Sequence, residues 1–450
     1  MKLLLVDSGE QYLERTRAMG KPYPHAGIGY LATICDRAGH DVTVVDMAAQ
    51  QVRATDFSSV VDRTSPDVVA ISSMTYAMPC TYTIARTVKE QDDIPIVVGG
   101  VHPTLLPERT LTECPEIDYV IRGEGENALP ALMDHLEGTV DIADVTNMVY
   151  RSEDHLKMNP LTYIEPLDRL PFPDWSLFDY ALYYRLPTEE GDISLYQINS
   201  SRGCPYSCTF CSPIHGKKVR YRSASSLLSE IRFNHDTYSA CHFDFADSNA
   251  TLNRKGFMDL CMLLIQEGLS EEVGWSIDTH VGHLDPELLS LAKRAGLRFI
   301  SIGVESGDEF MLRHIGKRTT LAQTESVIKK AHELGIKVKC SFILGHPYET
   351  IESAEKTAQY ALYLRKKYKI EYYYNLMDVY PETPLFAMVD KREGGARWIP
   401  GKRNNWAAYR RDEPMIEVND LTEPVLNRLY NRYTTHIDSE TGSNFYEEGE

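Results

Sequence analysis

The chain has 450 residues, 43% of them hydrophobic and 25% charged, and these globular proportions exclude a fibrous repeat and a wholly disordered chain. Its 47 lysines and arginines against 65 aspartates and glutamates give a formal charge of −18, which argues against a general nucleic-acid-binding protein. No apolar run approaches the about 18–20 residues that span a bilayer, and the apolar start ends at Asp7, too early for a signal peptide. We therefore expect two or three domains in a cytoplasmic protein with no membrane partner.

The first 137 residues alternate short β-branched runs with amphipathic segments of about 10–16 residues, such as 27–38 and 80–90. This alternation predicts an α/β domain with a doubly wound, Rossmann-like parallel sheet, and its ligand would lie beyond the carboxyl ends of the strands. The expected strands cover residues 3–7, 42–46, 68–72, 96–98 and 119–121. Prolines are frequent in residues 138–190, and we expect these residues to form a linker with little regular structure.

A second alternating series covers residues 191–384 and ends in a C-terminal extension, 385–450, that we expect to act as a cap or to line the substrate site. Six β/α units fall short of the eight in a closed barrel, so the series predicts a partial (β/α)6 barrel of the TIM type. The expected strands cover 194–199, 242–245, 274–277, 299–302, 337–344 and 371–379, and the helices 224–234, 254–267, 286–295, 321–334 and 353–366.

Nine cysteines are present, and an odd number scattered along the chain does not indicate a disulfide framework. Six stand apart in apolar surroundings and are expected to be buried thiols. The other three, Cys204, Cys208 and Cys211, follow the first strand of the second series at spacings of four and three. Three thiolates on one loop suit a [4Fe–4S] cluster with one open iron. A zinc site closed by His215, or three unligated thiols, are the alternatives.

The segment Cys-x-x-x-Cys-x-Phe-Cys resembles the radical S-adenosylmethionine enzymes. The resemblance implies that Cys204, Cys208 and Cys211 hold the cluster, next to Phe210, while S-adenosylmethionine chelates the fourth iron. Asp244 and Asp247, after the second strand, resemble the polar segment that accepts hydrogen bonds from the methionyl ammonium group. As an alternative, these acids would cap the helix that follows.

Further matches continue through the second series. Glu305 and Ser306 resemble the fourth-strand ribose and carboxylate contacts, and Gly345 opens a Gly-x-Pro-x-Glu turn that the resemblance places near adenine. His346 stands in that turn where the family usually has an apolar residue, either as a surface change or as a substrate-facing or proton-handling group. Lys217, Lys218, Arg220 and Arg222 would hold an anion or form the solvated start of a helix.

Three segments of the first domain, 24–30, 98–104 and 122–126, are rich in glycine. With them, the domain resembles the cobalamin-binding domain of B12-dependent radical S-adenosylmethionine enzymes. Glycine pairs at a strand end also suit close approach of the backbone to a flat macrocycle. A nucleotide-binding or purely structural sheet is the alternative. Residues 7–12 lack the histidine that replaces the lower cobalt ligand in many cobalamin proteins, so no protein histidine ligand is expected. The expected cobalamin contacts are Tyr76, Met78, Gly99, Gly100, His102, Gly123 and Glu124.

Together these matches imply an enzyme that uses a [4Fe–4S] cluster, S-adenosylmethionine and cobalamin, and that methylates an unactivated carbon of a small molecule. A non-methylating radical reaction, such as ring contraction, cyclisation, oxidation or sulfur insertion, is the main alternative. A cobalamin-binding sensor is a further one. The resemblance also implies an electron donor such as flavodoxin or ferredoxin. Catalytic residues and the substrate do not follow from the sequence.

Overall fold

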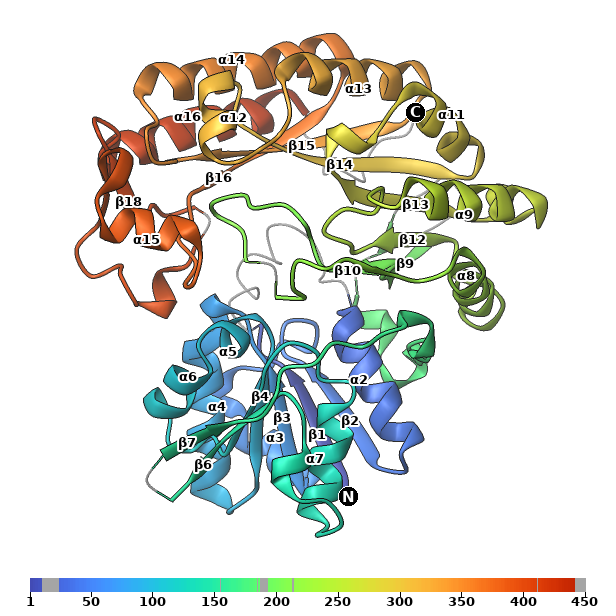
Figure 1. Cartoon of the computed structure of the whole chain (residues 1–450), viewed down its shortest axis with the longest axis vertical. Helices are drawn as coiled ribbons and strands as arrows, with labels where there is room; N and C mark the ends of the chain where they lie inside the picture. Colours follow the sequence, from blue (N-terminus) through green and yellow to red (C-terminus); the bar gives the residue numbers. More distant parts are fainter. Residues whose placement is uncertain are drawn as a thin grey trace. The chain divides into compact units, whose positions relative to one another are not determined.

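The structure is a computed structural model of the chain, and it describes residues 1–9, 24–153, 155–183, 185–186, 193–212, 214–410 and 412–441. The chain forms two compact units, Met1–Tyr184 and Arg185–Glu450, each built around its own seven-stranded sheet (Figure 1). No helix within the described ranges is long and apolar enough to cross a membrane. The predicted boundaries of four parts, 1–137, 138–190, 191–384 and 385–450, stay predictions.

The first unit has the predicted doubly wound sheet, with strand order β2-β1-β3-β4-β5-β6-β7 and parallel pairing from β2 to β5. Its apolar strand residues are almost fully buried between two layers of helices. The parallel strands are β1 (Lys2–Asp7), β2 (Asp41–Asp46), β3 (Val68–Ser72), β4 (Ile96–Gly99) and β5 (Tyr119–Ile121). The helices are α2 (Ala26–Arg37), α3 (Ser58–Thr64), α4 (Met78–Gln91), α5 (Val101–Leu105), α6 (Pro107–Glu113) and α7 (Ala128–Leu136).

A β-hairpin extends this sheet inside the segment expected to have little regular structure. Strands β6 (Met148–Ser152) and β7 (His155–Met158) pair antiparallel, and β6 pairs antiparallel with β5. Asn147, just before β6, donates from Nδ2 to the Glu124 carbonyl at 2.8 Å and accepts from the Thr162 amide at 2.6 Å. These contacts join residues far apart in sequence, so local patterning did not reveal the hairpin.

Asp7 and Asp46 end strands β1 and β2 directly opposite each other, and burial raises the pKa of each carboxyl to about 6. A pKa raised in the folded state favours folding below the unfolded value near 3.8, and that stability is lost as the pH rises through about 6. We expect Asp46→Asn to leave stability unchanged near pH 4 and to add about 2–3 kcal/mol at pH 7.5. Hydrogen exchange of the β1 amides at both pH values measures this difference.

Asp41→Asn, at the exposed start of β2, is the matched control and should show no such pH-dependent gain. An equal gain at both pH values for Asp46→Asn would contradict the explanation by charge.

The second unit has the predicted open half-barrel, with strand order β16-β15-β14-β13-β12-β9-β8 and parallel pairing from β9 to β16. The six parallel strands are β9 (Ile193–Ile198), β12 (His242–Phe245), β13 (Gly274–Thr279), β14 (Leu297–Glu305), β15 (Lys337–Leu344) and β16 (Glu371–Leu376), and β8 (Arg185–Leu186) pairs antiparallel with β9. The helices between them are α8 (Ala224–Tyr238), α9 (Arg254–Gln266), α10 (Leu269–Glu272), α11 (Pro286–Arg294), α12 (Glu309–His314), α13 (Leu321–Glu333) and α14 (Ile351–Tyr368).

The C-terminal extension closes over the end of this sheet that holds β16. It contains α15 (Pro384–Asp390), the hairpin β17 (Ala396–Trp398) and β18 (Ile416–Val418), and α16 (Glu423–Thr441), and its tyrosine Tyr433 packs 5.3 Å from the ring of Tyr374 on β16. The extension also reaches the cysteine loop, because the Leu385 amide donates to the Thr209 carbonyl at 2.9 Å.

The inner face of the half-barrel is polar and reachable by solvent. Along β15 the residues Val338, Cys340, Phe342 and Leu344 are buried, while the alternate residues are only partly buried. A polar row, Asp278, Ser301, Lys339 and Glu371, crosses β13 to β16 in direct register on that second face. A closed barrel fills its interior with branched apolar side chains, so this half-barrel leaves room that a packed core would not.

Candidate functional site

The three clustered cysteines lie on a loop at the carboxyl end of β9, and backbone contacts hold that loop at several points. Cys204 donates from its amide to the Gly216 carbonyl at 3.2 Å, and Thr209 donates to the Ile315 carbonyl at 3.0 Å. Gly203 has φ +101°, and a Cβ there would lie 2.4 Å from the Lys218 carbonyl oxygen, so only glycine fits before Cys204.

Tyr206, between the first two cysteines, attaches the loop to the end of β13. Its ring stacks on His280 with centroids 4.7 Å apart, and its hydroxyl is hydrogen-bonded to Nε2 of His283. The Lys217 ammonium donates to the Tyr206 carbonyl and, at 3.3 Å, to the Ser207 hydroxyl. The cysteine loop is therefore fixed by side chains that come from other parts of the half-barrel.

The three clustered thiols lie near one another. Burial raises the pKa of Cys208, and burial followed by the charges of Cys208 and Cys204 raises the pKa of Cys211 to about 11. A [4Fe–4S] cluster would bind each of the three thiolates through a different iron.

The structure places the two predicted acids of β12 in different surroundings. Asp247 is 3% exposed and accepts from the Ser200 amide at 3.0 Å and from the amide and hydroxyl of Ser201. Asp244 accepts from the Ser276 hydroxyl at 2.6 Å on the inner face, and burial raises its pKa to about 6. Both carboxylates therefore already have protein donors, and Asp247 fastens the chain that leads into the cysteine loop.

Glu305 ends β14 in a buried ion pair with Lys317, at 2.9 Å. Its φ is +69°, and the pairing of β14 with β15 shifts register between Gly303 and Glu305. A Cβ on Gly303 would lie 2.2 Å from the Glu305 carboxylate and 2.9 Å from the Lys317 ammonium, so the pair lies over the glycine. A side chain at position 303 would therefore displace this ion pair.

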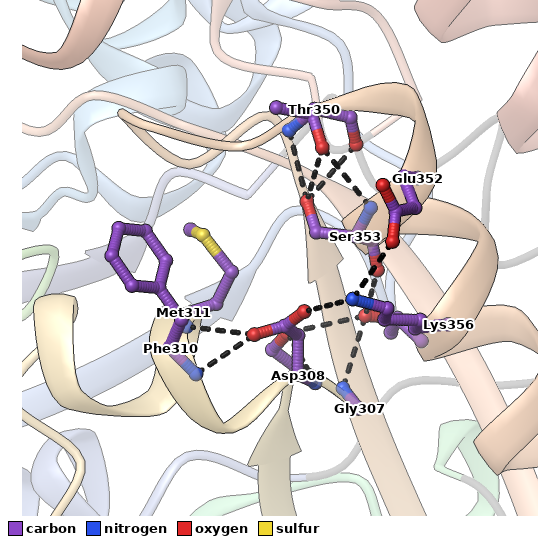
Figure 2. A network of polar contacts seen from close by, with 10 residues as sticks. Gly307, Asp308, Phe310, Met311, Thr350, Glu352, Ser353 and Lys356 are labelled. Atoms are coloured by element: carbon purple, nitrogen blue, oxygen red, sulfur yellow. Dashed lines mark hydrogen bonds and ion pairs between the residues drawn. The ribbon is translucent and has the colours of Figure 1, made fainter.

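Ser306 is fully buried and bonded within the protein. Its hydroxyl lies 3.1 Å from that of Thr357, which also accepts from the Gly307 amide at 3.0 Å. Figure 2 shows the polar network around this turn, in which Lys356 bridges Asp308 at 3.2 Å and Glu352 at 3.1 Å. The network connects the end of β14 to the first turns of α14. Ser306, predicted to contact the ribose, thus helps to hold this strand and this helix together.

The Gly-x-Pro-x-Glu turn after β15 is buried. Gly345 has φ +96° and donates from its amide to Glu349 at 2.5 Å, and burial raises the pKa of Glu349 to about 7. His346 is 0% exposed and lies 5.9 Å from Phe210 between ring centroids, and burial lowers its pKa to about 3. The surface-change interpretation of His346 is therefore wrong: the imidazole is neutral and faces the aromatic residue of the cysteine loop.

Two of the four basic residues after the cysteines are likewise buried. Arg222 forms an ion pair with Glu230 in which the two side chains are 2% and 0% exposed, and Arg220 donates to the His215 carbonyl at 3.3 Å. The prediction of a solvated helix start is wrong for these arginines, whereas Lys217 and Lys218 are exposed. Buried Arg222 therefore binds to α8 through Glu230 rather than binding a ligand.

Sequence reasoning gave no role to Tyr206, His280 and Lys317. Tyr206 lies inside the cysteine motif, and its aromatic ring was the signal available. The other two are brought there only by folding: His280, after β13, stacks on Tyr206, and Lys317, after α12, pairs with Glu305 at the end of β14. Burial lowers the pKa of His280 to about 4, with Lys317 and His283 as further causes.

In the first unit, Gly100 follows β4 with φ +102°, and a Cβ there would lie 2.6 Å from the Ser73 oxygen and 2.7 Å from its nitrogen. Gly99 is less crowded, since its Cβ would meet the Ile121 oxygen only at 3.6 Å. The backbone after β4 thus lies directly against the backbone after β3, and this contact leaves no room for a side chain at Gly100.

We expect Gly100→Ala to destabilise the first unit by about 3–5 kcal/mol, because a strained φ and a backbone clash add together. Gly39→Ala is the control: Gly39 has φ +91° but nothing within 4 Å of an added Cβ, so the change should cost only about 1–2 kcal/mol. Hydrogen exchange of β3 and β4 measures both. Equal costs would contradict the steric argument.

The other predicted cobalamin contacts differ in how far their side chains are exposed to solvent. Met78 and His102 are 0% exposed; Met78 accepts from the Ser73 hydroxyl at 3.2 Å, and His102 Nδ1 lies 3.4 Å from the Thr75 hydroxyl. Burial lowers the pKa of His102 to about 4, so its imidazole is neutral. Tyr76 is only half-buried.

Gly123 and Glu124 hold the segment after β5. The Gly123 amide, at φ +69°, donates to the Thr104 hydroxyl at 2.9 Å, and the buried Glu124 carboxylate accepts from the Ile164 amide at 2.7 Å. A set of hydroxyls that sequence reasoning missed lies at the ends of β1 and β3: Thr81 is 3.0 Å from Ser8 and 2.9 Å from Ser73. Part of residues 7–12, where the absence of a histidine was noted, lies outside the described residues.

Two sequence families match the chain. The family described as the B12 binding domain covers residues 16–133, and the radical SAM superfamily covers residues 198–361. Over 440 residues the chain is 30% identical to an uncharacterized methyltransferase of Pyrococcus horikoshii, a match that covers 95% of this chain and 90% of that protein. It is 31% identical over 352 residues to an anaerobic magnesium-protoporphyrin IX monomethyl ester cyclase of Rubrivivax gelatinosus, covering 75% and 62%.

Solved structures share the fold. The radical S-adenosylmethionine methyltransferase TsrM from Kitasatospora setae, with cobalamin and a [4Fe–4S] cluster bound, matches with a TM-score of 0.69 at 17% identity and covers 87% of this chain and 75% of that one. The cobalamin-dependent S-adenosylmethionine radical enzyme OxsB matches with a TM-score of 0.69 at 19% identity, covering 87% and 60%.

Proposed function

The chain belongs to the cobalamin-binding radical S-adenosylmethionine enzymes, and from that membership we propose that it methylates an unactivated carbon of a small-molecule substrate. The observation that carries this proposal is the similarity, over nearly the whole of both chains, to a relative named as a methyltransferase. The cysteine spacing agrees with it, since three thiolates on one loop would leave one iron of a [4Fe–4S] cluster open.

Each cofactor has residues that would hold it. Cys204, Cys208 and Cys211 would bind the [4Fe–4S] cluster, and S-adenosylmethionine would lie beside Phe210 and the ends of β12 to β15. When bound, the cluster supplies the electron that cleaves S-adenosylmethionine, and cobalamin carries the methyl group. In our proposal Gly99 and Gly100, at the end of β4, would contact the corrin, and no protein histidine would bind the cobalt.

The protein's own part in this proposal is to fix geometry. Tyr206 and Lys217 hold the cysteine loop, and Asp247 anchors the chain just before it. Glu305 and Lys317 are buried at the end of β14, and their opposite charges balance each other. Such fixed groups orient a substrate carbon and limit the access of water to a radical.

The proposal extends to the protein's partners and location. An electron donor such as flavodoxin or ferredoxin would reduce the cluster, and the reaction would take place in the cytoplasm, where thiolate ligands stay reduced. In the four-part division of the chain, residues 385–450 would line the substrate site, which agrees with the contact between Leu385 and Thr209.

A non-methylating reaction is the second candidate, because the chain is also 31% identical to a cyclase. S-adenosylmethionine with a deuterated methyl group separates the two. We expect the reconstituted, reduced enzyme, supplied with cobalamin and a small-molecule extract, to form 5′-deoxyadenosine and a product that carries the labelled methyl group. Formation of 5′-deoxyadenosine without labelled product would favour the second candidate, and formation of neither would contradict both.

A further inference from the structure

The surroundings of the cysteine loop are basic, although the chain as a whole is acidic. Two segments meet there: residues 200–223, which contain the loop, and residues 310–324, which run from α12 into α13. Together they hold eight of the chain's 47 lysines and arginines and none of its 65 aspartates and glutamates. Charge gathered in this way creates a local positive potential on a protein whose formal charge is −18.

Backbone contacts hold the second segment directly against the cysteine loop. The Thr209 amide donates to the Ile315 carbonyl at 3.0 Å. A Cβ on Gly316 would lie only 3.0 Å from the Ser207 carbonyl oxygen, so the two backbones touch at this point. The positive charges of the two segments therefore belong to one place on the second unit.

Three of these charges are exposed to solvent. The side chains of Lys218, Arg313 and Arg318 are exposed, and so is Cys211 on the loop itself. The charge of Arg318 acts on the loop, because it opposes the rise that burial causes in the pKa of Tyr206. We call Lys218, Arg313 and Arg318 the basic patch.

Three acids beside the second segment are already bonded within the protein. Glu305 pairs with Lys317 at 2.9 Å, Asp308 pairs with Lys356 at 3.2 Å, and Glu309 accepts from the Leu321 amide at 2.8 Å. Among the residues that the structure describes, no ion pair includes Arg313 or Arg318. A third segment that touches the loop carries an exposed acid, Glu382, three residues before Leu385. The arginine charges of the basic patch thus stay available to a partner.

We propose that the basic patch docks an acidic electron-transfer protein, which passes one electron to a [4Fe–4S] cluster on the cysteine loop. The donor loses one electron and the cluster gains it, and no bond or proton has to move. Opposite charges speed the encounter of two proteins and orient them before contact, so they would bring the donor to the loop that holds the cluster. The inference rests on the proposed function for the presence of that cluster.

An acidic protein fits the basic patch better than a small anion does. The three side chains come from two segments and are exposed, and a small ion held only by exposed charges gains little in water. A protein engages several such charges at once, and exposed charges act mainly on the rate of association.

The first measurement is binding without electron transfer. The full chain, reconstituted with its cluster under anaerobic conditions, is titrated by calorimetry with an oxidised, acidic flavodoxin. At an ionic strength of about 0.01 M, charges act over about 30 Å, and the triple variant Lys218→Glu, Arg313→Glu and Arg318→Glu should bind at least about tenfold more weakly than the unchanged chain. At about 1 M salt, where screening cuts this range to about 3 Å, the difference should disappear.

The matched control reverses three other exposed charges and so changes the net charge equally. Arg294→Glu, Lys329→Glu and Lys366→Glu lie near the carboxyl ends of α11, α13 and α14. These helix ends are at the opposite edge of the sheet from the cysteine loop, because helices that connect parallel strands run back along them. An equal loss of binding in both triple variants would show that only net charge matters, and would overturn the proposal.

The second measurement is the rate of cluster reduction, followed by absorbance. Reduced flavodoxin should reduce the cluster of the basic-patch variant at least about tenfold more slowly than that of the unchanged chain. Photoreduced 5-deazariboflavin, a small uncharged reductant, should reduce both at the same rate. An unchanged rate with flavodoxin, or equal slowing with both reductants, would contradict docking at the patch. Neither measurement includes S-adenosylmethionine, so a failure of methyl transfer leaves the result as it is, and failure of docking leaves the proposed function standing.

Discussion

We expect Cys208→Ala to abolish the formation of 5′-deoxyadenosine and to lower the iron content of the reconstituted chain. Loss of a residue that merely orients a metal ligand costs about 10–100-fold in activity, and loss of a ligand itself should cost more than 100-fold. Cys208 lies in the middle of the loop, where its thiol is near the other two cysteines and cannot be replaced by a neighbour. Iron analysis, the visible spectrum of the cluster and chromatography of the nucleoside product measure the change.

Cys261→Ala is the matched control for this variant. Cys261 is a buried thiol on α9 of the same unit, and it should retain both iron and product formation. Full iron content and normal 5′-deoxyadenosine formation in Cys208→Ala would exclude the three-thiol cluster.

We expect Arg222→Met to destabilise the second unit by about 3–5 kcal/mol, because it leaves the Glu230 carboxylate buried without its partner. The two side chains are 2% and 0% exposed, and burial already raises the pKa of Glu230. Removing both charges should restore most of the loss, since Arg222→Met with Glu230→Leu buries no unpaired ion. Urea unfolding of the full chain, followed by hydrogen exchange in α8, measures these differences.

Arg232→Ala tests the same chemistry on the outside of the same helix. Arg232 and Glu267 form an ion pair in which both side chains are more than 40% exposed, so its loss should leave α8 as stable as before. A comparable loss of stability in Arg222→Met and Arg232→Ala would show that burial does not set the strength of the Arg222–Glu230 pair.

Much of the fold could be predicted from the sequence, because each buried parallel strand appears there as a short apolar run and these runs alternate with helical segments. All five strands expected in the first domain and all six in the second are present, with small shifts at their ends. The cysteine spacing likewise indicated a cluster before any contact was known. The β6–β7 hairpin escaped prediction because its support, such as Asn147 bonding to Glu124 and Thr162, comes from residues far along the chain.

The candidate site could be predicted only where its residues lie in one segment. Asp247 was expected to face a ligand, but its oxygens are bonded to Ser200 and Ser201, 46–47 residues earlier. Arg222 was expected in solvent for the same reason: nothing in the sequence shows that Glu230 is buried opposite it. Contacts between residues far apart in sequence decide which polar side chains stabilise the fold and which could bind a ligand.

The register shift between Gly303 and Glu305, where β14 pairs with β15, sets the position of the Glu305 side chain. With one extra residue in β14, Glu305 leaves the simple alternation of faces and folds back over Gly303. Deleting Val304 would return the strand to regular alternation and remove this arrangement without changing any charged residue. The length of this strand, and not only its side chains, thus decides whether a charged group stands at this edge of the sheet.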